Sequence, residues 1–146
     1  MLNAPARIKG HWSHFDHGAD IGLRAEAQSK AALFELMGEA LTAVVTAPQS
    51  VRPEVEISIR CEAPDDAVLL VDWLNALIYE MVTRSLLFSA WHVEIDDHRL
   101  SATVLGQAVD RTVHEPAVEV KGATYTALEC SHQPDGRWTA QCVVDV

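Results

Sequence analysis

The feature that most constrains the fold of this chain is an apolar stripe near its middle. Between Leu69 and Val82, large apolar side chains recur at i, i+1, i+4 and i+5, which places them on one side of an α-helix. Such a helix has to be buried against another layer of structure, here predicted to be a β-sheet. The polar residues Asp72, Asn75 and Glu80 within the same stretch exclude a membrane span. The stripe consists of Leu69, Leu70, Trp73, Leu74, Leu77, Ile78, Met81 and Val82.

Helix-end signals and strand alternation supply the other elements. Ser29 suits the N-cap of a first helix that ends before Pro48, and Pro64 with two following acids suits the start of the long helix. Alternation of apolar and polar residues predicts strands at 21–27, 55–61, 91–95 and 100–104, and a closing hairpin of about 123–131 and 137–146. The order predicts an α+β protein, with two helices packed on a mainly antiparallel β-sheet in an α/β sandwich.

The length of the chain fits one domain. Residues 1–12 have no clear period, so we interpret them as a lead-in segment that can be disordered, and we expect residues 13–146 to form a single domain.

In the closing hairpin, a two-residue loop at Asp135 and Gly136 would put Cys130 near Gln141 and not opposite Cys142. No disulfide is therefore expected across it.

Charge and cysteine content narrow the class of protein. Lys and Arg number 11 against 21 Asp and Glu, a formal net charge of −10, which opposes direct non-specific binding to nucleic acid. The three cysteines form no C-x-x-C pair and no apolar leader opens the chain. We expect reduced thiols in a cytoplasmic protein that does not enter membranes.

Several stretches carry residues that could do chemistry. His17-Gly18-Ala19-Asp20-Ile21-Gly22 holds an acid between two glycines, and this pattern is typical both of a tight turn and of a built site. His11, His14 and His17, with two acids among them, leave open a zinc or nickel site, although no helical pattern fixes them on one face. A second polar stretch runs from His114 to Gly122. None of the phosphate-loop, dinucleotide-binding or nucleophile-elbow motifs occurs.

Taken together, four separated motifs resemble the archease family, in the right order and over nearly the whole chain from about His14. They are His17-Gly18-Ala19-Asp20-Ile21-Gly22, Leu69-Leu70-Val71-Asp72-Trp73-Leu74-Asn75, His114-Glu115-Pro116 with Glu119-Val120-Lys121 and Thr124-Tyr125, and Val144-Asp145-Val146.

The resemblance implies a protein that is not an enzyme itself. It would activate an RtcB-type RNA ligase, promoting guanylylation of the ligase and its multiple turnover in tRNA splicing or RNA repair. It also implies a divalent metal ion, Ca²⁺, Mg²⁺ or Mn²⁺, held by Asp20, Asp145 and a backbone oxygen of Val146. His17, His114 and Lys121 are candidate contacts with the partner or a nucleotide. Independently of the resemblance, both acids fall on the polar side of their predicted strands.

The sequence departs from the family pattern at three positions. Gly18 stands where the family usually has threonine, Gly122 where it has another small residue, and Thr126 where it has histidine, so no catalytic role is assigned around Thr126.

Two other functions stay open. One is a metal-dependent phosphoester hydrolase that uses Asp20, Asp145 and His114, and the other is a chaperone-like binding module.

Overall fold

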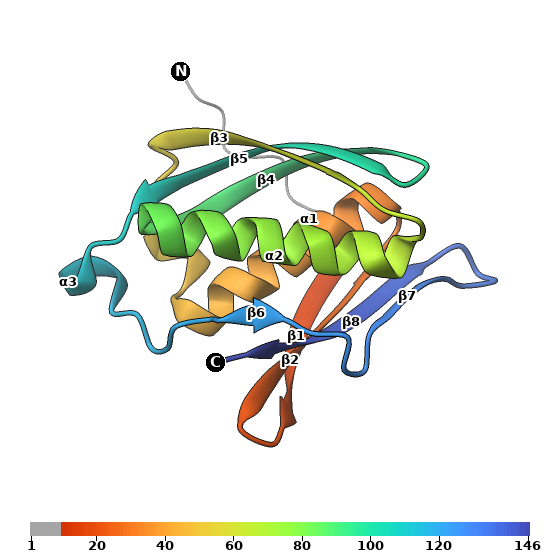
Figure 1. The fold of residues 1–146 in the computed structure, drawn as a ribbon, viewed down its shortest axis with the longest axis horizontal. Helices are drawn as coiled ribbons and strands as arrows, with labels where there is room; N and C mark the ends of the chain where they lie inside the picture. Colours follow the sequence, from red (N-terminus) through yellow and green to blue (C-terminus); the bar gives the residue numbers. More distant parts are fainter. Residues whose placement is uncertain (1–9) are drawn as a thin grey trace.

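The computed structural model describes residues 10–146, which fold into eight strands, three α-helices and one 3₁₀ turn (Figure 1). In chain order these are β1 (Gly10–His17), β2 (Asp20–Ala27), α1 (Lys30–Val45), η1 (Pro48–Ser50), β3 (Val55–Glu62), α2 (Asp66–Arg84), β4 (Leu86–Asp96), β5 (Arg99–Ala108), α3 (Arg111–His114), β6 (Gly122–Ala123), β7 (Glu129–His132) and β8 (Trp138–Asp145).

The strands form two antiparallel sheets that enclose α1 and α2. The first sheet has the order β1-β2-β8-β6, with β7 also paired to β8, and the second has the order β3-β5-β4. Figure 1 shows the two long helices as a layer between the sheets. The predicted α+β class and the antiparallel pairing are confirmed, but the strands divide into two sheets and do not form one.

The helix starts follow the capping residues that the sequence indicated. The Ser29 hydroxyl accepts a hydrogen bond from the backbone N–H of Ala32 at 3.1 Å, and a carboxylate oxygen of Asp65 accepts one from Val68 at 2.9 Å. Each bond satisfies a first-turn N–H that has no partner within the helix. The predicted starts of both long helices are confirmed.

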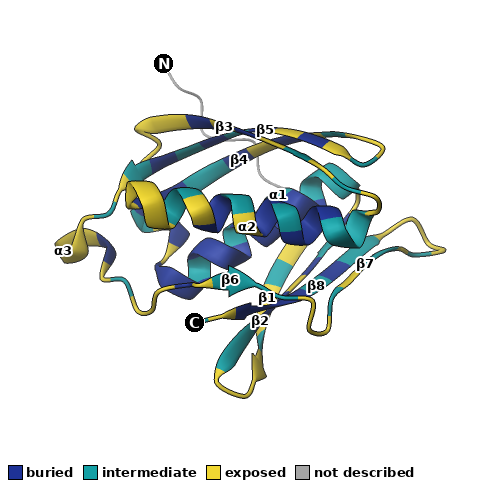
Figure 2. Cartoon of the chain, in the orientation of Figure 1, coloured by how far each residue is buried: buried dark blue, intermediate teal, exposed yellow. Residues whose placement is uncertain are grey.

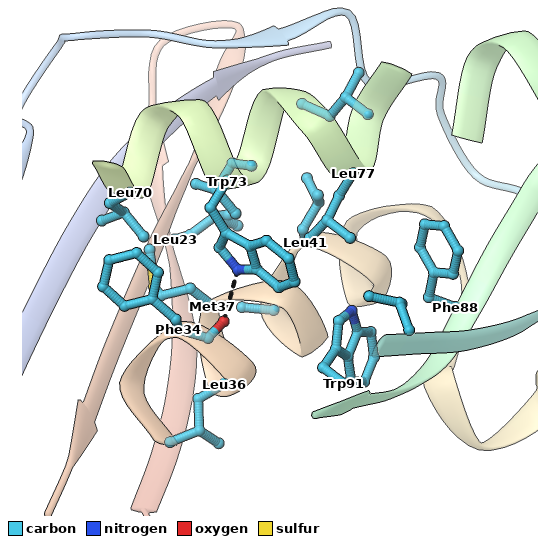
Figure 3. Close-up of a cluster of buried hydrophobic side chains, with 14 of the residues drawn as sticks. Leu23, Phe34, Leu36, Met37, Leu41, Leu70, Trp73, Leu77, Phe88 and Trp91 are labelled. Carbon is cyan, nitrogen blue, oxygen red and sulfur yellow. Dashed lines mark hydrogen bonds between the residues drawn. The ribbon is translucent and has the colours of Figure 1, made fainter. Parts of the chain in front are cut away.

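The core fills the space between the sheets. Trp73 of the apolar stripe is fully buried, and its indole N–H donates to the carbonyl oxygen of Phe34 at 2.9 Å (Figure 3). This bond joins α2 to α1 and satisfies the single polar atom of a large apolar side chain. Buried residues continue from the helices into both sheets, while the outer sides of the strands are mostly exposed (Figure 2).

Strand β1 begins at Gly10, inside the segment that the sequence suggested as a lead-in. Of its eight residues, only Trp12 and Phe15 are even half-buried, so β1 has no apolar alternation to mark it in the sequence. Within residues 10–146 it is an edge strand, paired with β2 alone. Residues 1–9 of the proposed lead-in lie outside the described residues.

The closing hairpin also differs in detail. Its first arm is interrupted, so that β6 and β7 pair with two separate parts of β8. Cys130 lies opposite Ala140, one position from the expected Gln141, because the loop is longer than the two residues assumed. Cys61, Cys130 and Cys142 are all free thiols.

Gly38 permits the close packing of α1 on β4, and its substitution provides a test of that packing. A Cβ at this position would lie 2.8 Å from Cδ1 of the buried Trp91. Alanine normally stabilises a helix interior by about 1 kcal/mol relative to glycine, but here we expect Gly38→Ala to lower the free energy of unfolding by about 1–3 kcal/mol. Urea denaturation measures the sign, and a more stable variant would contradict the tight contact.

Glu35 on α1 is half-buried against the edge of β4. Its carboxylate accepts the backbone N–H of Val93 at 2.9 Å. Desolvation raises the pKa of Glu35 above its ordinary 4.5, and the Val93 bond and nearby His92 oppose this only in part. The folded protein therefore holds this proton to a higher pH than the unfolded chain does, and stability falls as pH rises between the two pKa values.

Glu35→Gln removes that titration and keeps an oxygen that accepts the Val93 bond. We expect the difference in unfolding free energy, variant minus wild type, to become more positive as pH rises from about 4 to about 7. Urea titrations across this range measure the trend. A difference that stays constant or turns negative with rising pH would show that Glu35 has no raised pKa in the folded state.

Candidate functional site

Asp20 and Asp145 are about 125 positions apart in the sequence. They lie side by side on adjacent strands of the first sheet. Strands β2 and β8 pair with Ile21 opposite Val144, and the same antiparallel register continued by one residue puts Asp20 opposite Asp145. His17 lies opposite Asp20 on β1, and Gly122 lies opposite Asp145 on β6. The four strands thus carry one row of residues, His17, Asp20, Asp145 and Gly122, which we call the carboxylate row.

Backbone hydrogen bonds fix the chain around the row. The N–H of Val146 donates to Oδ1 of Asp20 at 3.4 Å, and the N–H of Lys121 donates to the carbonyl oxygen of Asp145 at 2.8 Å. Asp145 and Val146 are therefore held between β2 and the segment that enters β6. The structure brings the three expected metal-binding residues, Asp20, Asp145 and Val146, to one end of one sheet.

Both carboxylates lie on the side of the sheet away from the helices. Val144 is fully buried in the core, and Ile21 and Val146 pack against that core. Side chains alternate between the two sides of a strand, so Asp20 and Asp145 belong to the outer side. Asp20 is half-buried and Asp145 is exposed, in agreement with the polar positions predicted for them.

Gly22 makes room for an aromatic ring on the outer side of the sheet, a role that the sequence did not indicate. It lies within straight strand β2, and the ring of its partner Phe15 lies across it, where a Cβ would come within 2.2 Å of the ring. The next residue across the sheet is Val143, which is only 1% exposed although it faces outward. The guanidinium of Arg24 lies 4.4 Å from the centroid of the Phe15 ring. An apolar patch thus borders the carboxylate row.

The turn between β1 and β2 does depend on a glycine. Gly18 has a φ of +61°, in the left-handed region, and a Cβ there would meet nothing within 4 Å. Its two-residue loop with Ala19 sets His17 directly opposite Asp20. The tight turn and the site are therefore one structure.

The charges of the row are uncompensated within the part of the chain that is described. Among residues 10–146, neither Asp20 nor Asp145 forms a salt bridge. Like charges directly opposite each other destabilise a strand pair, and a bound cation would reverse the effect. No group of three or more His, Cys, Asp or Glu side chains placed to hold a metal occurs in the same range.

His17 is exposed within the row and Lys121 is exposed next to it, but His114 is elsewhere. His114 is 3% exposed, its Nδ1 accepts the backbone N–H of Asp110 at 2.9 Å, and its Nε2 lies 2.9 Å from Oε1 of Gln107. With its ring buried and both nitrogens engaged, His114 joins α3 to the end of β5. It is not placed to contact a partner, contrary to the expectation from sequence.

The three-histidine cluster considered for zinc or nickel does not form. His11 and His17 lie on one side of β1, about 20 Å apart at about 3.3 Å per residue, and His14 lies on the other side. Nε2 of His14 is 2.8 Å from the carbonyl oxygen of Ala40 on α1.

Thr126, where the family usually has histidine, is exposed and donates its N–H to Oγ1 of Thr124 at 3.1 Å.

Asn75 has a positioning role that the sequence alone did not reveal. Its Oδ1 accepts the backbone N–H of Ala123 at 2.9 Å, which ties β6 to α2. Because Lys121 and Gly122 precede Ala123 directly, this bond also fixes one end of the carboxylate row. In the sequence, Asn75 is the last residue of one of the four family motifs, but nothing there indicated its bond to Ala123.

Comparison with known proteins gives a consistent family. Residues 12–146 match the model described as the Archease protein family (MTH1598/TM1083). The chain is 34% identical to Protein archease of Pyrococcus furiosus over 139 residues, which is 92% of this chain and 98% of that protein. It is 30% identical to Protein archease of Methanothermobacter thermautotrophicus over 143 residues, 95% of this chain and 100% of that protein.

A solved structure extends the likeness to the fold. The solution structure of Methanobacterium thermoautotrophicum protein 1598 superposes with a TM-score of 0.80 at 30% identity, covering 92% of this chain and 98% of that one. Among the described residues, no helix is long and apolar enough to cross a membrane. Four motifs, a family model over nearly the whole chain and a matching fold agree that this chain belongs to the archease family.

Proposed function

We propose that this protein activates an RtcB-type RNA ligase, acting on tRNA halves or broken RNA through that partner, with a divalent metal ion at the carboxylate row. The observation that carries the proposal is the position of Asp20 opposite Asp145, beside Val146, in a chain that belongs to the archease family. The role as an activator follows from the family resemblance. The row adds the residues through which the role would be exercised.

The donor set fits a hard divalent ion. Asp20 and Asp145 offer carboxylate oxygens and Val146 a backbone oxygen, which are ligands that Ca²⁺, Mg²⁺ and Mn²⁺ accept. A cation would also relieve the repulsion between two carboxylates that have no salt bridge within residues 10–146. Three protein groups leave coordination positions for water, a phosphate or a group of the partner.

The exposure of the row favours action on a partner over catalysis by this chain alone. Asp145 and Lys121 are both exposed, so a second protein can reach them. The hydrolase alternative needs His114 beside the two acids, but that ring is buried against Asp110 and Gln107. Lys121 is the nearest basic group in sequence to the row, and it suits a contact with a nucleotide phosphate or an acid of the ligase.

The activator role predicts a gain in covalent GMP labelling of a cognate ligase. With Mn²⁺ and GTP present, wild-type protein should increase the labelling, and Asp20→Ala should reduce the increase to background. Asp20 lies at a strand end outside the core, so we expect the variant to lose less than about 1 kcal/mol of stability without metal. The readout is the labelled ligase band after incubation with radiolabelled GTP.

Glu56→Ala is the matched control for this assay, since Glu56 is an exposed acid on the other sheet. It should retain the full increase. Labelling that is the same with and without wild-type protein would refute the activator role.

We predict that substitution of Asp145 weakens metal binding and that substitution of Lys121 weakens only the contact with the partner. Asp145→Asn keeps the size of the side chain but removes a charge, and we expect it to weaken Mn²⁺ binding about tenfold or more. Lys121→Ala keeps the backbone N–H that binds Asp145, so it should retain Mn²⁺ affinity while lowering the labelling gain. Calorimetric titration with Mn²⁺ measures the first effect. Equal affinity of wild type and Asp145→Asn would mean that the ion binds elsewhere.

A further inference from the structure

A groove of about 1230 Å³ is lined by residues of β1, α1 and β4. Its walls include Gly10 and Trp12 of β1 and Trp91 of β4, and Glu35 and Glu39 of α1 also line it. Both β1 and β4 are edge strands, each paired with one neighbour among the described residues. The groove is separate from the carboxylate row, which uses the opposite end of β1.

The register of β1 shows which of its backbone groups point away from β2. In a hairpin with a two-residue loop, the residues that flank the loop exchange hydrogen bonds, and alternate residues beyond them point their N–H and C=O outward. His17 and Asp20 flank the loop here. Trp12 and Gly10 are therefore among the residues that present backbone groups at the edge. An exposed strand edge of this kind is a template for a further strand.

Strand β4 follows the same hydrogen-bonding rule. Asp96 and Arg99 flank the two-residue loop between β4 and β5, so Val93 should point its backbone groups outward. The Val93 N–H indeed points away from β5 and donates to Glu35 at 2.9 Å. The edge of β4 is thus partly capped by a side chain, and the edge of β1 is the more open of the two.

The groove carries negative charge without a fixed counter-charge. Glu35 and Glu39 lie four residues apart on α1, where like charges are neighbours and repel. Among residues 10–146, neither forms a salt bridge. Burial raises the pKa of Glu35, so its charge is held at a cost that an incoming cation would lower.

We propose that this groove binds an extended, basic segment of a protein partner, which adds a strand to the outer edge of β1 and sets lysine or arginine side chains against Glu35 and Glu39. Backbone groups that point outward at the edge favour an extended occupant, because a helix satisfies its own N–H and C=O groups. The two carboxylates select for basic side chains at alternate positions, which a strand directs to one side. The inference does not depend on the ligase or on the metal ion.

The test uses a fluorescein-labelled octapeptide of alternating lysine and valine with the full-length protein. We expect saturable binding in fluorescence anisotropy that weakens with added salt, and changes in the amide NMR signals of Gly10, Trp12 and His14. A peptide with glutamate in place of lysine should not bind. A lysine peptide N-methylated at alternate residues keeps its charge but loses strand hydrogen bonds, so it should bind more weakly.

Substitutions in the protein test whether the peptide binds in the groove. Glu35→Gln and Glu39→Gln should each weaken the lysine peptide about two- to fivefold, the range for partly exposed ion pairs. Glu56→Gln, on the exposed outer side of β3, should change nothing, and Asp20→Ala should also bind normally. Equal binding of the acidic or N-methylated peptide, or amide changes confined to other surfaces, would overturn the proposal.

Two other occupants would also overturn it. A second copy of the chain would appear as a concentration-dependent dimer that the peptide does not dissociate. The chain's own residues 1–9 would be the occupant if the peptide bound only to a variant lacking residues 2–9.

Discussion

The pairing of β2 with β8 is the contact on which both the fold and the site depend. It joins the beginning of the domain to its end, places Leu23 and Cys142 in the core together, and brings Asp20 opposite Asp145. Antiparallel register has a period of two, so a slip of one residue would turn the acids inward and the core residues outward. The burial of one side of the sheet therefore determines the position of the charges on the other.

The sequence predicted the elements whose burial has a period. The stripe is confirmed from Leu69 to Ile78, but Val82 at its end is exposed. The alternating strands at 21–27 and 55–61 are confirmed because each buries one side. Strand β1 was missed because an edge strand with two mostly exposed sides leaves no such pattern. The division into two sheets could not be predicted either, since a stripe shows that a helix is covered but does not tell which strands cover it.

The site residues, unlike the elements of the fold, are not related to one another by any periodic pattern in the sequence. Strand parity put Asp20 and Asp145 outside the core, but only the motif resemblance linked them, since nothing local relates residues so far apart. The same resemblance suggested His114 as a contact, and the structure buries it. Motif residues can maintain a scaffold as well as a site, and Gly22, beneath the ring of Phe15, is a further example of a scaffold residue.

The end of the sheet is a place where a charged site has little effect on the core. Two opposed carboxylates cost stability wherever they lie, but here one is exposed and neither fills core volume. The surrounding chain is held by backbone bonds from Lys121 and Val146 and by the Asn75 bond to β6. Loss of either acid leaves the backbone bonds of Lys121 and Ala123 in place. The fold and the charge of the row can therefore be varied separately, as a site that acts on a partner requires.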